Sequence, residues 1–74
     1  MSRPAGEIEA GLLAAHGAGD GTALVGLYTE AAEAAGDVDR ACFFLTHAYI
    51  FALEAGDARA GALYARLKAE GRES

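Results

Sequence analysis

His16, His47 and Cys42 carry the side chains best suited to act as a base, a nucleophile or a metal ligand. Cys42 and His47 are five residues apart, a spacing that separates them by about 140° around a helix. They therefore do not form a cysteine–histidine pair on one surface. No two of these three residues have the short spacing of zinc ligands. The sequence predicts no catalytic residue, no metal site and no cofactor, and we expect a protein that is not an enzyme.

Two other segments have compositions that occur in ligand-binding loops. The stretch from Gly17 to Gly21 is rich in glycine, but it lacks the Gly-Lys-Ser/Thr ending of a phosphate-binding loop. Acidic residues are concentrated between positions 30 and 39, but their spacing is not that of a calcium loop. Helix ends and solvated surface explain both segments.

The helices that must position these residues are marked by a tripeptide. Ala-Gly-Asp occurs at residues 18–20, 35–37 and 55–57. Glycine accepts the left-handed conformation that ends a helix, and the following aspartate can cap the next one. The sequence therefore predicts a single all-α domain over residues 1–74, a small bundle of four antiparallel helices at about 4–16, 22–35, 38–55 and 58–70.

The third predicted helix, residues 38–55, is apolar around most of its circumference. Even its more polar side, which carries His47 and Glu54, includes Phe43 and Ile50. Four helices in 74 residues can hardly surround one of their number, and a large apolar side chain left in water forgoes ~1.5–3 kcal/mol. We therefore expect a protein partner, most simply a second copy in a homodimer, on a face formed by Phe43, Thr46, His47, Ile50 and Glu54.

Aromatic residues on the inward side of the second and third helices suggest an alternative function. Ligand sites do form between the helices of a bundle. In this alternative the chain is a ligand-binding or regulatory bundle with an apolar pocket between those two helices, although a small-molecule ligand is less expected than a protein partner. The candidate pocket residues are Tyr28, Phe44, Tyr49 and Phe51.

The segment from Thr22 to Ala55 resembles one tetratricopeptide (TPR) repeat. A Gly-Asp corner at residues 36–37 is followed by Ala41, Leu45 and Ala48, the small–large–small spacing of that family's second helix. The segment departs from the family pattern because it lacks the early tryptophan and the Leu-Gly pair of the first helix. The resemblance implies TPR-like helical hairpins that bind proteins without catalysis.

Composition limits the kinds of partner and the compartment. The formal net charge is −5, with 11 acidic and 6 basic residues, so this acidic protein is not expected to bind nucleic acid. No apolar stretch approaches the ~20 residues that cross a bilayer, and no secretory signal is present at the N-terminus. With one cysteine and no intrachain disulfide, the chain is expected in the cytoplasm, without a membrane partner.

Overall fold

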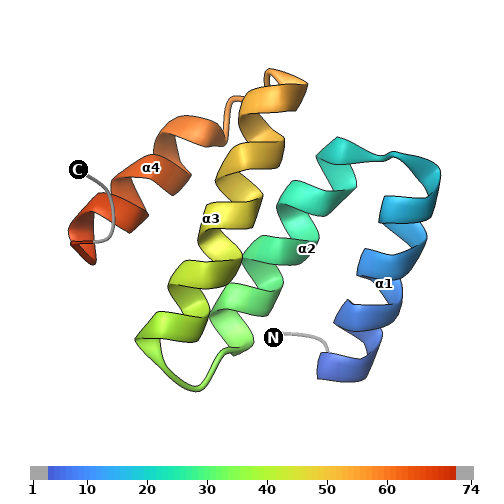
Figure 1. Cartoon of the computed structure of the whole chain (residues 1–74), viewed down its shortest axis with the longest axis horizontal. Helices are drawn as coiled ribbons and strands as arrows, with labels where there is room; N and C mark the ends of the chain where they lie inside the picture. Colours follow the sequence, from blue (N-terminus) through green and yellow to red (C-terminus); the bar gives the residue numbers. More distant parts are fainter. Residues whose placement is uncertain (1–3, 72–74) are drawn as a thin grey trace.

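The helices of this protein follow the predicted order closely. The computed structural model describes residues 4–71, which form α1 (Ala5–Ala18), α2 (Gly21–Ala34), α3 (Val38–Ala55) and α4 (Ala60–Ala69), with no strand in that range (Figure 1). The predicted all-α fold is thus confirmed. Two ends differ from prediction by two residues, since α1 continues through Gly17 to Ala18 and α4 begins at Ala60, while the other ends agree within one residue.

The first and third Ala-Gly-Asp corners end their helices in the same way. Gly19 and Gly56 take left-handed φ values of 67° and 64°. At the end of α1, the amide of Asp20 donates to the carbonyl of Ala15 at 2.9 Å. This pattern, which is repeated at the end of α3, is the Schellman motif that satisfies the last carbonyls of a helix. Because the left-handed residue is Gly19, the helix includes Gly17, which the sequence had placed in a loop.

The aspartates of the corners differ in what they cap. Asp20 and Asp37 accept hydrogen bonds from backbone amides three residues later, at 3.1 and 2.8 Å, and so begin α2 and α3. Asp57 accepts instead from the amide of Arg59 at 2.9 Å, within a turn that precedes α4. The second corner also has no left-handed glycine, because α2 ends at an extended Ala35. One sequence motif therefore forms three different corners.

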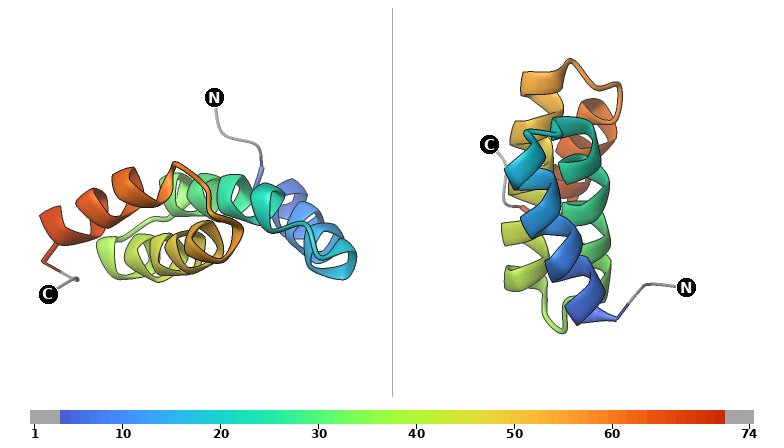
Figure 2. Two further views of the ribbon diagram at one scale, coloured as in Figure 1. Left: turned by 90° about the horizontal axis from the view of Figure 1, so that it is seen from above. Right: turned by 90° about the vertical axis from the view of Figure 1, so that its right-hand side faces the viewer.

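The last three helices form two layers. Viewed from above, α2 and α4 lie in one layer and α3 in the other, and α1 runs obliquely beside α2 (Figure 2). The α2–α3 pair packs along its length, while α1 packs on α2 and α4 on α3. Gly11 lets α1 approach α2 closely, since a Cβ at this position would be 3.0 Å from Cδ2 of Leu27. None of the helices in residues 4–71 is long and apolar enough to cross a membrane.

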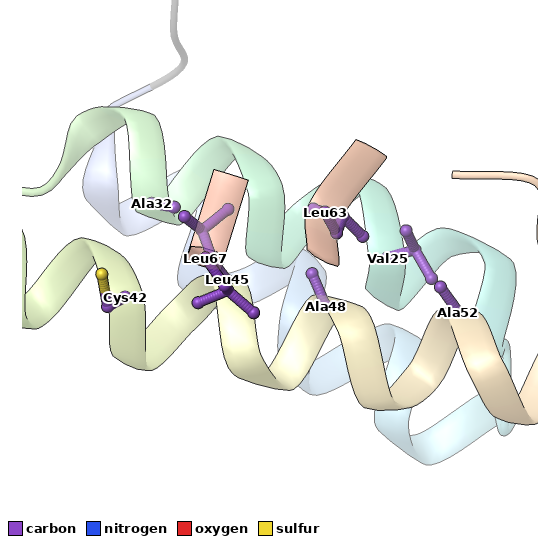
Figure 3. Close-up of a cluster of buried hydrophobic side chains, with 8 residues drawn as sticks. All are labelled: Val25, Ala32, Cys42, Leu45, Ala48, Ala52, Leu63 and Leu67. Carbon is purple, nitrogen blue, oxygen red and sulfur yellow. The ribbon is translucent and has the colours of Figure 1, made fainter. Parts of the chain in front are cut away.

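The hydrophobic core lies between α2, α3 and α4. Small side chains on α3 leave room above this helix. Leucines of α4 and aliphatic residues of α2 pack together in that space (Figure 3). Ala48, Ala52, Val25 and Leu67 have no exposed surface at all. The helix α1 contributes buried residues of its own, Ile8 and Ala15. The core cluster consists of Val25, Ala32, Cys42, Leu45, Ala48, Ala52, Leu63 and Leu67.

Candidate interaction surface

The outward face of α3 exposes large apolar side chains. Phe43 is 58% exposed and Ile50 is 46% exposed, both on the face expected from the sequence. Leu53, which is 56% exposed, lies three residues after Ile50 and extends the same row. The outer stripe of α3 is defined here as Phe43, Thr46, His47, Ile50, Leu53 and Glu54.

The polar residues inside the outer stripe hydrogen-bond to their own helix. Thr46 Oγ1 donates to the carbonyl oxygen of Cys42 at 2.8 Å. His47 Nδ1 lies 2.9 Å from the carbonyl oxygen of Phe43 and must donate to it, because a carbonyl only accepts. The rings of His47 and Phe43 also lie against each other, with centroids 4.5 Å apart. Thr46 and His47 thus need few hydrogen bonds from a partner protein, and the stripe is suited to apolar packing against another protein surface.

Three of the four candidate pocket residues lie together. The ring of Tyr28 stacks on Phe51 with centroids 5.8 Å apart, and Phe44 lies 6.3 Å from Tyr28. From α1, His16 Nε2 makes a 2.9 Å hydrogen bond with the hydroxyl of Tyr28 and contacts Phe51 edge-on. These residues form the aromatic cluster: His16, Tyr28, Phe44 and Phe51. The rings pack against one another at the place where the alternative function required a pocket.

Tyr49 is separate from the aromatic cluster. Its ring lies 5.8 Å from that of Tyr64, so it packs towards α4. Tyr49 follows Phe44 by five residues and precedes Phe51 by two, spacings that turn it away from both rings on a helix. The aromatic cluster does reach the outer stripe, because Tyr28 also lies 5.1 Å from the ring of His47.

A cavity of about 310 Å³ lies between α1 and α3, over the end of α2. Phe44 is the one candidate pocket residue that lines it. The first helix, to which the sequence assigned no wall, supplies Ile8, Glu9 and Leu12, and α3 adds Arg40. The cavity therefore lies beside the pocket predicted between α2 and α3, on the side where α1 packs.

The residues considered for chemistry are dispersed. Cys42 is buried in the core, His47 is on the outer stripe and His16 is in the aromatic cluster. Residues 4–71 hold no group of three or more His, Cys, Asp or Glu side chains that could bind a metal ion.

A close ion pair joins Asp57 Oδ2 to Arg59 Nη2 at 2.6 Å. Hydrogen bonds from the side chain and the backbone of Arg59, helped by its positive charge, lower the pKa of Asp57 to about 2. The same interaction raises the pKa of Arg59. Arg59 Nη2 also donates to the carbonyl oxygen of Thr22 at 3.0 Å. The pair holds the corner between α3 and α4 against the start of α2 and is structural.

Sequence reasoning missed two features of these surfaces. Leu53 was left out of the expected interaction face, although its spacing of ten residues from Phe43 and three from Ile50 places it with them. His16 was not assigned to the aromatic cluster, and nothing in the local sequence indicates that its ring reaches Tyr28 twelve residues later.

Comparison with known proteins identifies no relative. No family model matches this chain, and no match was found among curated proteins or solved structures. The resemblance of Thr22–Ala55 to a TPR repeat stays a prediction.

Proposed function

We propose that this chain is a small, non-catalytic protein–protein interaction module of the cytoplasm, which associates with a second copy of itself through the outer stripe of α3. The observation that carries the proposal is the row of Phe43, Ile50 and Leu53, each about half exposed. Scattered single apolar residues are normal on a protein surface, whereas a contiguous row on one helix is typical of an interaction site.

The size of the row favours a second copy as the partner. Covering the exposed half of each of the three side chains is worth roughly 1 kcal/mol, because complete burial is worth ~1.5–3 kcal/mol. Association itself costs several kcal/mol. In a twofold symmetric dimer the same stripe is buried on both subunits, which doubles the gain. The doubled gain is similar in size to the cost of association, so we expect a weak dimer that forms only at high protein concentration.

The polar part of the stripe supports the same proposal. Burying a hydroxyl or an imidazole is costly when its hydrogen bonds to water are lost. Thr46 and His47 Nδ1 already donate to carbonyls of α3, so covering them loses few such bonds. Glu54 is at the C-terminal end of the stripe and is exposed, where a carboxylate can stay hydrated at the rim.

The proposed arrangement includes the TPR-like hairpin of α2 and α3. Its support is that Leu45 is 3% exposed and Ala48 is fully buried, as small–large–small packing against a neighbouring helix requires. A cytoplasmic location is supported by the free thiol of Cys42.

Sedimentation equilibrium between about 10 and 300 µM tests the association. We expect the wild type to move from monomer to dimer over that range, and Phe43→Glu and Ile50→Glu to stay monomeric, because a charge would be buried without a partner. Leu13→Glu is the matched control, since Leu13 is 71% exposed on α1, outside the stripe. Circular dichroism verifies that each variant is folded. A wild type that stays monomeric throughout, or stripe variants that dimerise like the control, would contradict the proposal.

A further inference from the structure

The cavity between α1 and α3 is distinct from the outer stripe of α3. Its apolar walls include Ile8 and Leu12 from α1 and Phe44 from α3, with Ala31 of α2 at its base. Ile8 and Ala31 are buried, so these walls are held by packing within the fold. A volume of about 310 Å³ is at the lower end of the range of small-molecule sites, roughly 300–1,000 Å³.

The two helices that form the cavity walls also contact each other elsewhere. About two helical turns further along, His16 of α1 contacts Phe51 of α3, with ring centroids 5.6 Å apart. This contact spans the two helices that form the walls. The cavity volume of about 310 Å³ suits a ligand with a short chain or a single ring.

Arg40 contributes the one positive charge among the lining residues of the cavity. The ion pairs with both partners among residues 4–71 join Arg59 to Asp57 and Arg66 to Glu33, and the guanidinium of Arg40 takes part in neither. The long side chain of Arg40 can bring its guanidinium to a carboxylate in the cavity and bind it through two parallel hydrogen bonds. Glu9 on the opposite helix is the other charged residue of the lining, and its repulsion disfavours a ligand with two negative charges.

We infer that the cavity binds small amphiphilic monocarboxylates. The apolar part of the ligand lies against Ile8, Leu12 and Phe44, and its carboxylate accepts hydrogen bonds from the guanidinium of Arg40. The inference does not depend on self-association, because the cavity residues and the outer stripe share no member.

Titration of the ¹⁵N-labelled protein with octanoate, followed by NMR, tests this binding. We expect saturable shifts concentrated at the amides of Ala31, Ala34 and Gly36, which line the cavity. Octylammonium, with the same tail and the opposite charge, is expected to bind at least about tenfold more weakly. The variant Ile50→Glu keeps the cavity, and its affinity for octanoate should equal that of the wild type.

Substitutions at the two charged residues give opposite expectations. Arg40→Met keeps much of the side-chain length but removes the charge, and should raise the dissociation constant for octanoate about tenfold. Glu9→Gln removes a negative charge that repels the ligand's carboxylate, and should lower the dissociation constant for octanoate. Ala34→Leu narrows the cavity and should weaken octanoate binding. Equal affinities for octanoate and octylammonium, no effect of Arg40→Met, or shifts centred on the outer stripe would each overturn the inference.

Discussion

Tyr28 of α2 and Phe51 of α3 form a parallel stacked pair, with ring centroids 5.8 Å apart and planes 7° from parallel. His16 of α1 meets both rings edge-on and bonds to the Tyr28 hydroxyl, so three helices converge at this point. The main core, by contrast, is formed by α2, α3 and α4. The stacked pair is therefore one place where α1 is attached to the α2–α3 hairpin, in addition to the contact of Gly11 with Leu27 and the burial of Ile8 and Ala15.

Replacing His16 with alanine should loosen α1 selectively. The variant loses two ring contacts and one hydrogen bond, which together are worth about 1 kcal/mol at a partly exposed site. We expect faster amide hydrogen exchange along α1 than along α2 and α3. Tyr28→Phe, which keeps the rings and loses the hydroxyl, should have a smaller effect. Uniform acceleration along all four helices would show that α1 is not attached through this residue.

Leu67 of α4 is expected to be essential for stability. It has no exposed surface and closes the core over α3. Removing a buried leucine side chain costs about 2–5 kcal/mol, a large part of the stability of so small a domain. Urea denaturation of Leu67→Ala should show this loss, while Leu13→Ala, at a 71% exposed position, should stay within about 0.5 kcal/mol of the wild type. Similar losses in both variants would contradict the core described above.

The helices could be predicted because local residues determine them. Gly19 and Gly56 adopt the left-handed conformation, and Asp20 and Asp37 cap the helices that follow. These interactions lie within five residues of one another and are visible in a sequence. The start of α4 was harder to predict. Asp57 pairs with Arg59 in a turn, and α4 therefore begins only at Ala60.

The side chains that meet between helices could be predicted only in part. A helical wheel groups Phe43 with Ile50, and Tyr28 with the inward side, without reference to any other helix. It does not reveal which neighbour covers a given side, and so Leu53 was left out of the expected interaction face and Tyr49 was placed in the pocket. The cavity lies beside the expected pocket for the same reason, because Ile8, Glu9 and Leu12 of α1 form part of its wall.

Asp57 should make stability depend on pH in strongly acidic solution. Its pKa is about 2 in the folded protein, against 3.8 as the reference value. The folded state therefore favours the ionised carboxylate, and the resulting stabilisation is present above pH 3.8 and lost as the pH falls through 2. We expect the urea midpoints of the wild type and Asp57→Asn to differ at pH 5 and to converge near pH 2. A difference that is constant with pH would show that the charge of Asp57 does not contribute.

Two alanine substitutions in glycine positions should have opposite effects on stability. Gly56 has a φ of 64°, where an alanine is strained by roughly 1–2 kcal/mol. Gly17 lies inside α1, and a Cβ added there meets nothing within 4 Å, so alanine should stabilise the helix by about 0.5–1 kcal/mol. Urea denaturation of Gly56→Ala and Gly17→Ala measures both changes. If Gly17→Ala were as destabilising as Gly56→Ala, α1 would have to end before residue 17, as the sequence had suggested, and Gly19 would not be its C-cap.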